Sequence, residues 1–332
     1  MIIGKMKLIP CRIIFLLFMA LLLTGEKLQG QIQTLDFQKS AENKIKIPSL
    51  AHHRFVPNPY VRDPFIKTHI RNTLGIGQAI DLNIPLIEIG GETILGLRGN
   101  LLFTTLNFEY QHAVKDWLAV WGNFLIVGRL GTGIQSILAQ GITAGIQFEL
   151  GWMFKFVKTE RVMLSGTLNL WNSNGTVVDI LGFVSDIVDS TSNAQLVRSR
   201  PFLRGGGGLR FAWDISELVG LTLLSETGYG ESIDNRDKNK MFFELGGAID
   251  FDLMARTSVP VGFALGYSVS SFPSGSDNTL DSPVQDGFLR IAYTGSSNFI
   301  ISLDIIGSRI PLRQVDQTLN VSSVLINIRN YF

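Results

Sequence analysis

Hydrophobic and polar residues alternate along several stretches of the chain. In residues 243–253 apolar side chains, Leu245 among them, occupy every second position. Glu244, Asp250 and Asp252 lie between them, on the opposite face of an extended chain. The same alternation recurs in residues 102–112, 162–171 and 299–305. A period of two predicts β-strands that have one apolar and one polar face.

The connections between these stretches alternate in length. We expect strands near residues 70–80, 102–113, 117–129, 140–156, 160–172, 201–213, 218–230, 240–253, 259–271, 284–294, 297–308 and 320–332. Tight breaks, as at 114–116, alternate with long polar ones, as at 173–200. Short turns on one side, long loops on the other and an even strand count are typical of bacterial transmembrane barrels. The sequence therefore predicts an all-β, antiparallel transmembrane β-barrel of about twelve strands, with short loop helices.

The composition argues against membrane-spanning helices. Although 45% of the residues are hydrophobic, no stretch after residue 30 approaches the roughly eighteen consecutive apolar residues that mark a spanning helix. Hydrophobicity spread this thinly is typical of strands. A net charge of +1 gives no electrostatic reason to expect nucleic acid as a partner.

Residues 1–30 have the three-part layout of a secretory signal peptide. The chain begins with a basic region that contains Lys5, Lys7 and Arg12. The apolar run IIFLLFMALLL follows it, and polar residues come next. Because this run is too short for a spanning helix, we expect cleavage near residue 30. The one cysteine, Cys11, lies in the leader, so we expect the mature chain to have neither disulfides nor thiolate chemistry.

Two segments lack a clear strand pattern. Residues 31–66 are polar and contain four prolines, and we expect either a periplasmic extension or a plug inside the barrel. Residues 83–100, NIPLIEIGGETILGLRGN, form either an external loop with its own hairpin or two further strands. Two more strands would raise the count to fourteen. The expected layout is a signal peptide (1–30), an extension or plug (31–66) and a barrel (67–332).

The chain ends on the alternating stretch VLINIRNYF, in which Ile326, Ile328 and Phe332 share one face. This stretch resembles the C-terminal signature strand of Gram-negative outer-membrane β-barrel proteins. Asn330 departs from the pattern, which usually has an apolar or aromatic residue there. The resemblance implies the outer membrane of a Gram-negative bacterium as the location. It also implies that Ile326, Ile328 and Phe332 form an assembly signal, with the barrel-assembly machinery and outer-membrane lipids as partners.

Charged residues on the polar faces would point into the barrel. The expected lumen-lining residues are Glu109, Glu149, Arg204, Arg210, Glu226, Glu244, Asp250, Asp252, Arg290, Asp304 and Arg329. They either pair across a narrow interior and fill it, or line a polar permeation path. A charge that faced lipid instead would cost about 2–4 kcal/mol. The mixed signs argue against a strongly ion-selective pore.

Two expected loops are unusually apolar. Residues 175–190, GTVVDILGFVSDIVDS, have a helical period, and residues 128–141 have a shorter apolar set. The residues concerned are Val177, Ile180, Leu181, Val184, Ile187, Val188, Ile134, Ile137 and Leu138. The two helices either pack on each other as a lid or line an apolar ligand pocket or gate. The second alternative loosely resembles outer-membrane channels for hydrophobic compounds.

The histidines give little support to an enzyme. After the leader the chain has His52, His53, His69 and His112, and no serine lies at a recognisable catalytic spacing from them. The adjacent His52 and His53 fit an exposed, solvated pair better than a metal site. We expect no enzymatic activity, no cofactor and no metal.

These patterns together predict an outer-membrane channel or transporter through which small molecules, hydrophobic ones among them, diffuse. One alternative is a structural or adhesive barrel with a sealed lumen. The other is a lipid-modifying enzyme that acts at the barrel rim.

Overall fold

The computed structural model describes residues 46–89, 92–130, 142–178, 197–231, 239–271, 283–312 and 317–332. The chain divides into two compact units, Met1–Lys44 and Ile45–Phe332, and all the described residues belong to the second. The predicted signal peptide therefore lies outside the described residues.

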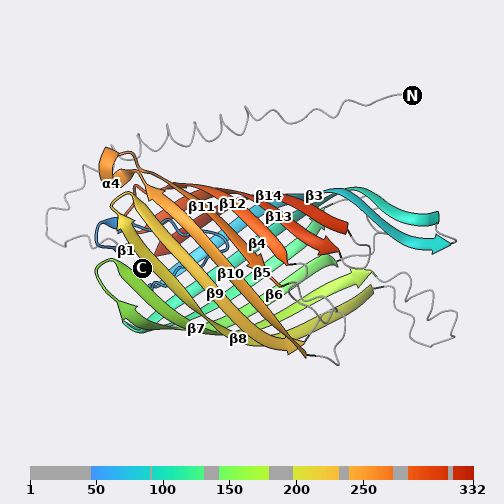
Figure 1. The fold of residues 1–332 in the computed structure, drawn as a ribbon, viewed down its shortest axis with the longest axis horizontal. Helices are drawn as coiled ribbons and strands as arrows, with labels where there is room; N and C mark the ends of the chain where they lie inside the picture. Colours follow the sequence, from blue (N-terminus) through green and yellow to red (C-terminus); the bar gives the residue numbers. More distant parts are fainter. Residues whose placement is uncertain are drawn as a thin grey trace. The chain divides into compact units, whose positions relative to one another are not determined.

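Twelve antiparallel strands close into a barrel (Figure 1). The strands are β3 (His69–Ile89), β4 (Glu92–Lys115), β5 (Leu118–Leu130), β6 (Ile142–Lys158), β7 (Val162–Val178), β8 (Val197–Ser216), β9 (Val219–Glu231), β10 (Asn239–Asp252), β11 (Val261–Ser270), β12 (Val284–Tyr293), β13 (Phe299–Leu312) and β14 (Gln317–Tyr331). Each strand pairs with its neighbours in sequence, and β14 pairs with β3. The predicted all-β barrel of about twelve strands is confirmed, and the alternative of fourteen is wrong.

Residues 83–100 continue two barrel strands instead of adding new ones. β14 pairs with β3 only as far as Ile80, and β5 pairs with β4 only as far as Leu102. Beyond these points β3 and β4 pair only with each other, after a register shift between Ala79 and Leu82. They form a hairpin that extends past the other strands (Figure 1). The expected external hairpin is present, but as an extension of β3 and β4.

The alternation of the sequence is visible in the exposure of the side chains. On β10 the side chain of Leu245 is 51% exposed, whereas Asp250 is 1% exposed. Large apolar side chains are exposed all round the barrel, for example Leu74, Phe108, Phe124, Leu168, Leu209, Leu223, Leu265, Ile305 and Ile326. Exposed apolar surface costs roughly 25 cal/mol per Å² in water, whereas hydrocarbon solvates it. An apolar outer wall around a polar interior is typical of a membrane-spanning barrel.

Short connections gather at one end of the barrel, here called the short-turn end. Residues 116–117 join β4 to β5, and Glu217 and Leu218 join β8 to β9. Helix α4 (Met254–Thr257) lies in the connection between β10 and β11. Among the described residues, no helix is long and apolar enough to cross a membrane.

Residues 46–68, here called the inner segment, lie inside the barrel at the short-turn end. The backbone N–H groups of Lys46 and Ile47 donate to the carbonyl of Ser297 in the β12–β13 connection. Two short strands, β1 (Ser49–Leu50) and β2 (His53–Arg54), pair with each other. Of the two positions expected for residues 31–66, residues 46–66 lie in the lumen.

The inner segment builds the apolar core of the barrel. Ile47, Val56 and Val61 pack in one cluster with wall residues of the second half of the barrel. Leu50, Phe55 and Phe65 pack in another cluster with Met163 and Ala212. Small wall residues make room for the segment, since Ala212, Ala248, Ala264 and Ala292 are all buried in these clusters. The core of this protein therefore lies inside the barrel, while the outer wall stays apolar and exposed.

Inward-facing glycines accept aromatic rings from neighbouring strands. A Cβ atom on Gly266 would overlap with the ring of Phe288, and one on Gly151 would overlap with the ring of Trp121. Glycine is thus required at these positions for close approach and not for backbone conformation. Gly287 on the outer wall is different, because a Cβ there would meet no atom within 4 Å.

Gly266→Ala is expected to lower the free energy of unfolding by about 1–3 kcal/mol, because the added methyl group must displace the ring of Phe288. Gly287→Ala is the matched control and should change it by less than about 0.5 kcal/mol. Urea unfolding in lipid vesicles, followed by the heat-dependent migration of the folded barrel on gels, measures both. Equal effects of the two substitutions would contradict the ring-on-glycine packing.

Candidate functional site in the lumen

The expected lumen-lining residues all lie on the inward faces of the strands. Nine are buried, namely Glu109, Glu149, Arg210, Glu226, Asp250, Asp252, Arg290, Asp304 and Arg329. Arg204 and Glu244 are half-buried. Charges buried in this way are tolerated only with partners, because removing an ion from water costs several kcal/mol.

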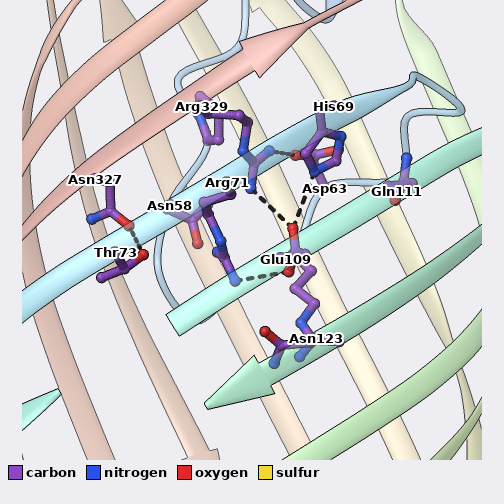
Figure 2. A network of polar contacts seen from close by, with 12 residues as sticks. Asn58, Asp63, His69, Arg71, Thr73, Glu109, Gln111, Asn123, Asn327 and Arg329 are labelled. Atoms are coloured by element: carbon purple, nitrogen blue, oxygen red, sulfur yellow. Dashed lines mark hydrogen bonds and ion pairs between the residues drawn. The ribbon is translucent and has the colours of Figure 1, made fainter. Parts of the chain in front are cut away.

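One network joins three neighbouring strands (Figure 2). In the barrel register Arg71 on β3 lies opposite Arg329 on β14 and also opposite Glu109 on β4. Glu109 accepts from Arg71 at 2.7 Å and from the ring of His69 at 3.1 Å, and Arg329 lies 3.7 Å from it. Two adjacent arginines thus face one wall carboxylate. Asp63 of the inner segment supplies a second carboxylate, 2.9 Å from Arg329.

A second cluster lies on β12 and β13. Arg290 and Asp304 are directly opposite in the register and form a bidentate ion pair at 2.5 and 2.7 Å. Asn327 also donates to Asp304, at 2.5 Å. The Arg290 guanidinium donates in addition to the carbonyl of Pro57 in the inner segment. This arginine therefore links the wall to the inner segment.

A third cluster lies on β8 and β9. Arg210 on β8 and Glu226 on β9 form an ion pair at 3.0 Å, and Asn169 donates to the same carboxylate at 3.1 Å. The guanidinium of Arg210 lies 4.7 Å from the centroid of the Trp121 ring, within the range of a cation–π contact. The amide of Asn169 and the ring of Trp121 thus lie against this ion pair.

The inner segment and the wall are complementary in charge. Arg62 forms a bidentate ion pair with Glu149 on β6, at 2.6 and 2.5 Å. Asp63 pairs with Arg329, and His53 lies 2.7 Å from Asp250 on β10. Arg62 and Asp63 supply the charge opposite to that of the wall, and His53 does so when it is protonated. This pattern fixes one position and one orientation of the segment in the lumen.

The interpretation of His53 as part of an exposed pair was wrong. Its side chain is fully buried, with Nε2 bonded to Asp250 and Nδ1 3.2 Å from the carbonyl of Glu217. Burial by itself would lower the pKa of His53, but the hydrogen bond and the charge of Asp250 outweigh it, and the pKa is raised. The sequence around His53 does not reveal the partner, because Asp250 is almost two hundred residues away.

Little free volume remains between the charged groups. A cavity of about 10 Å³ lies among Arg62, Asp63, Glu109, Arg210 and Arg329. This is room for about one water molecule. Around this group of charged residues, the lumen therefore has little free space.

Most of the residues expected to line a ligand pocket or gate lie outside the described part of the chain. Val177 lies in β7, so the predicted helix does not include it, and that part of the prediction is wrong. Ile180, Leu181, Val184, Ile187, Val188, Ile134, Ile137 and Leu138 lie outside the described residues. The expected assembly-signal residues Ile326, Ile328 and Phe332 face outward and are exposed.

The side chains of His53, His69 and His112 contact groups other than serine. His53 and His69 bond to carboxylates and backbone carbonyls, and Nδ1 of His112 lies 3.4 Å from the hydroxyl of Tyr110. Within the described ranges, no group of three or more His, Cys, Asp or Glu side chains is placed to hold a metal ion.

Several residues of the network were not singled out from the sequence. Arg71 continues the inward series of β3, in which His69 and Thr73 are also buried, so the period-two pattern contained the signal. Arg62 and Asp63 lie in a proline-rich segment without periodicity, and nothing local marks them as lumen residues.

Closed strand topology, an apolar outer wall and a charge-paired lumen define a transmembrane β-barrel. Comparison with protein-family models and with curated protein sequences finds no match. Among solved structures, an outer-membrane channel from Pseudomonas putida F1 is similar. It has 10% sequence identity and a TM-score of 0.50, and the alignment covers 84% of this chain and 100% of that one. At this identity the similarity shows the fold.

Two hydrocarbon transporters are more distant in structure. The monoaromatic hydrocarbon channel CymD aligns with 80% of this chain and 88% of its own at 10% identity, with a TM-score of 0.40. The Pseudomonas putida toluene transporter TodX aligns with 89% of this chain and 97% of its own at 9% identity, with a TM-score of 0.39. These superpositions are too loose to support an argument about cargo.

Arg290→Gln is expected to lower the free energy of unfolding by about 3–5 kcal/mol, because Asp304 would stay buried without its ion-pair partner. The exposed Arg256 of helix α4 provides the control, and Arg256→Gln should cost less than about 0.5 kcal/mol. Urea midpoints of the two variants in vesicles give the comparison. A loss below 1 kcal/mol for Arg290→Gln would show that water reaches Asp304.

Wild-type protein should be more stable than His53→Asn at acidic pH, and the difference should shrink as pH rises. The pKa of His53 is raised above its ordinary value of 6.5, so protonation favours the docked segment. This contribution is complete below about pH 6.5 and is lost as pH rises through the raised pKa. Urea midpoints of both proteins between pH 5 and pH 9 test it. A constant difference across this range would show that His53 does not titrate.

Proposed function

We propose that this protein is an outer-membrane diffusion channel for small molecules, whose path is closed at the short-turn end by the inner segment. One observation carries the proposal. The segment is bound across a complete barrel by side-chain ion pairs and apolar packing, and its own strands β1 and β2 pair only with each other. Its departure from the lumen would break no pairing between barrel strands.

The location in the outer membrane rests on the fold and the wall. Closed barrels with an apolar outer face, short turns at one end and a polar interior occur in the outer membranes of Gram-negative bacteria. Ile326, Ile328 and Phe332 of the C-terminal strand are exposed on the outer wall, which supports their proposed role as an assembly signal. The likeness to an outer-membrane channel supports the same fold.

The proposed cargo is small and carries little net charge. Within the described ranges, buried cations and carboxylates of the lumen lie next to one another, so they form no ring of one charge that would select ions. We keep hydrophobic compounds within the proposal because residues 131–141 and 179–196 contain the apolar stripes described above. We propose that these stripes line a ligand pocket or gate.

A sealed structural barrel is the second candidate. The packing of six buried apolar residues of the inner segment favours it, since such packing stabilises a closed lumen. The two functions differ in one property, which is whether the segment leaves the lumen while the barrel stays folded.

A disulfide between the inner segment and the wall separates these functions. Cγ2 of Val61, whose place the sulfur of a cysteine would take, lies 2.9 Å from where a Cβ on Gly246 would be, which leaves room for a second sulfur and an S–S bond of about 2.05 Å. In planar bilayers Val61→Cys/Gly246→Cys should conduct under reducing conditions and close on oxidation. Because the leader holds the natural cysteine, no other thiol of the mature chain interferes.

Wild type and the Val61→Cys single variant are the controls, and both should conduct regardless of redox conditions. Conductance that oxidation does not change would place the path elsewhere. If neither redox form of a folded barrel conducts, the sealed structural barrel replaces the channel.

A further inference from the structure

Two carboxylates of the lumen have no basic partner among the described residues. Asp286 on β12 is 8% exposed, and within the described ranges its one hydrogen bond comes from the Ser308 hydroxyl, at 2.5 Å. Glu244 on β10 is half-buried and forms neither a side-chain hydrogen bond nor a salt bridge with a described residue. Lys240 of the same strand is about 13 Å further along it. A buried carboxylate is costly unless a positive charge or a proton compensates it.

The barrel register brings these two carboxylates to the two sides of β11. Ser268 on β11 lies directly opposite Asp286, and Ser270 lies directly opposite Glu244. All four residues belong to the inward series of their strands. Side chains at directly opposite positions have Cβ atoms about 4.5–5.5 Å apart. The two carboxylates therefore flank a pair of serine hydroxyls on the lumen face of the wall.

Ser268 is an independent sign that a partner is missing. Its side chain is 2% exposed, and its hydroxyl has no hydrogen-bond partner among the described residues. Buried hydroxyl groups in proteins normally have such a partner. On the β10 side, Ser268 lies opposite Gly246, and the Val61 methyl group packs against that glycine. This side offers the hydroxyl no polar side chain, whereas the carboxylate of Asp286 lies on the other side.

The inner segment borders the same space. The Tyr60 hydroxyl shares a hydrogen bond with the Ser308 hydroxyl and lies within range of the charges of Asp286 and Glu244. The ring of Tyr60 lies beside that of Phe288, with centroids 6.3 Å apart, which fixes its position. The segment thus adds a further oxygen next to the two carboxylates.

The arginines of this region are already paired with other carboxylates. Arg62 of the inner segment is bound bidentately by Glu149. Arg290, four residues along β12 from Asp286, is bound bidentately by Asp304. Compensation from either guanidinium would require one of these ion pairs to break.

We infer that this part of the lumen binds one divalent metal cation of the Ca²⁺ type, with Asp286, Glu244 and the Ser268 hydroxyl as ligands. The two carboxylates balance the charge of one divalent cation. All the available donors are oxygens, which hard cations prefer. Ca²⁺ tolerates irregular geometry and takes roughly six to eight oxygens, so water molecules complete a site whose ligands come from three strands. This inference concerns binding and does not rest on conduction.

Terbium luminescence of the folded mature chain in phosphatidylcholine vesicles tests the site, because Tb³⁺ replaces Ca²⁺ at oxygen sites and emits when a nearby tyrosine is excited. Wild type should bind Tb³⁺ and exchange it for Ca²⁺ with a Kd of about 10⁻⁴–10⁻³ M, as in extracellular calcium modules. Asp286→Asn and Glu244→Gln should each weaken binding roughly tenfold or more, since each removes a charged ligand. Glu160→Gln, in the exposed β6–β7 turn, is the control and should bind like wild type. Heat-dependent gel migration verifies that each variant is folded.

Tyr60→Phe locates the bound ion. This variant should keep the Ca²⁺ affinity of wild type but lose most of the sensitised emission, because Tyr60 is the tyrosine beside the site. Full emission from Tyr60→Phe would place the ion elsewhere and overturn the site.

Two other results would also overturn it. Equal affinity of wild type and both carboxylate variants would mark adventitious ion binding. Absence of binding by wild type at neutral pH would mean that protons neutralise the two carboxylates. Neither result depends on whether the barrel conducts, so a failure of the channel proposal remains distinguishable.

Discussion

The structure depends on the pairing of charged side chains inside a barrel whose outer wall is apolar. Lipid covers the outward faces, and the charged residues of the lumen described above point inward, where little room for water remains around Arg62 and Glu109. The wall satisfies some charges by register, as in the pair of Arg290 and Asp304. Other wall charges find their ion-pair partner in the inner segment. Glu149 is the clearest case, since its partner is Arg62.

This constraint explains why a proline-rich segment lies in the lumen. Arg62, Asp63 and His53 each supply the sign that the wall lacks at their position. Apolar side chains of the same segment pack against small wall residues. The two contributions together hold the segment firmly, while barrel pairing remains independent of it. The protein thus combines a closed strand barrel with a segment that is docked inside it.

The period of two was sufficient to predict the strands and the inward direction of residues such as Glu109 and Asp304. Strand ends were less predictable, because backbone pairing continues past the point where the alternation weakens. Val177 is an example, since it extends β7 by pairing with Arg198 despite the helical period of its neighbours. The position of the inner segment was left open for a different reason. Its contacts join side chains distant in sequence, such as His53 and Asp250, and no local pattern encodes them.

Hydrogen exchange of the backbone amides of the inner segment tests most directly whether it is a docked but separable element. The N–H of Phe55 donates to the Pro48 carbonyl, and the N–H of Val56 donates to the Asp250 carboxylate, both at 3.0 Å. The account predicts that these amides exchange more slowly than free peptide and faster than amides of the barrel strands. Exchange at the free-peptide rate would show that the segment is not docked. Protection equal to that of the strands would show that it leaves only when the barrel unfolds.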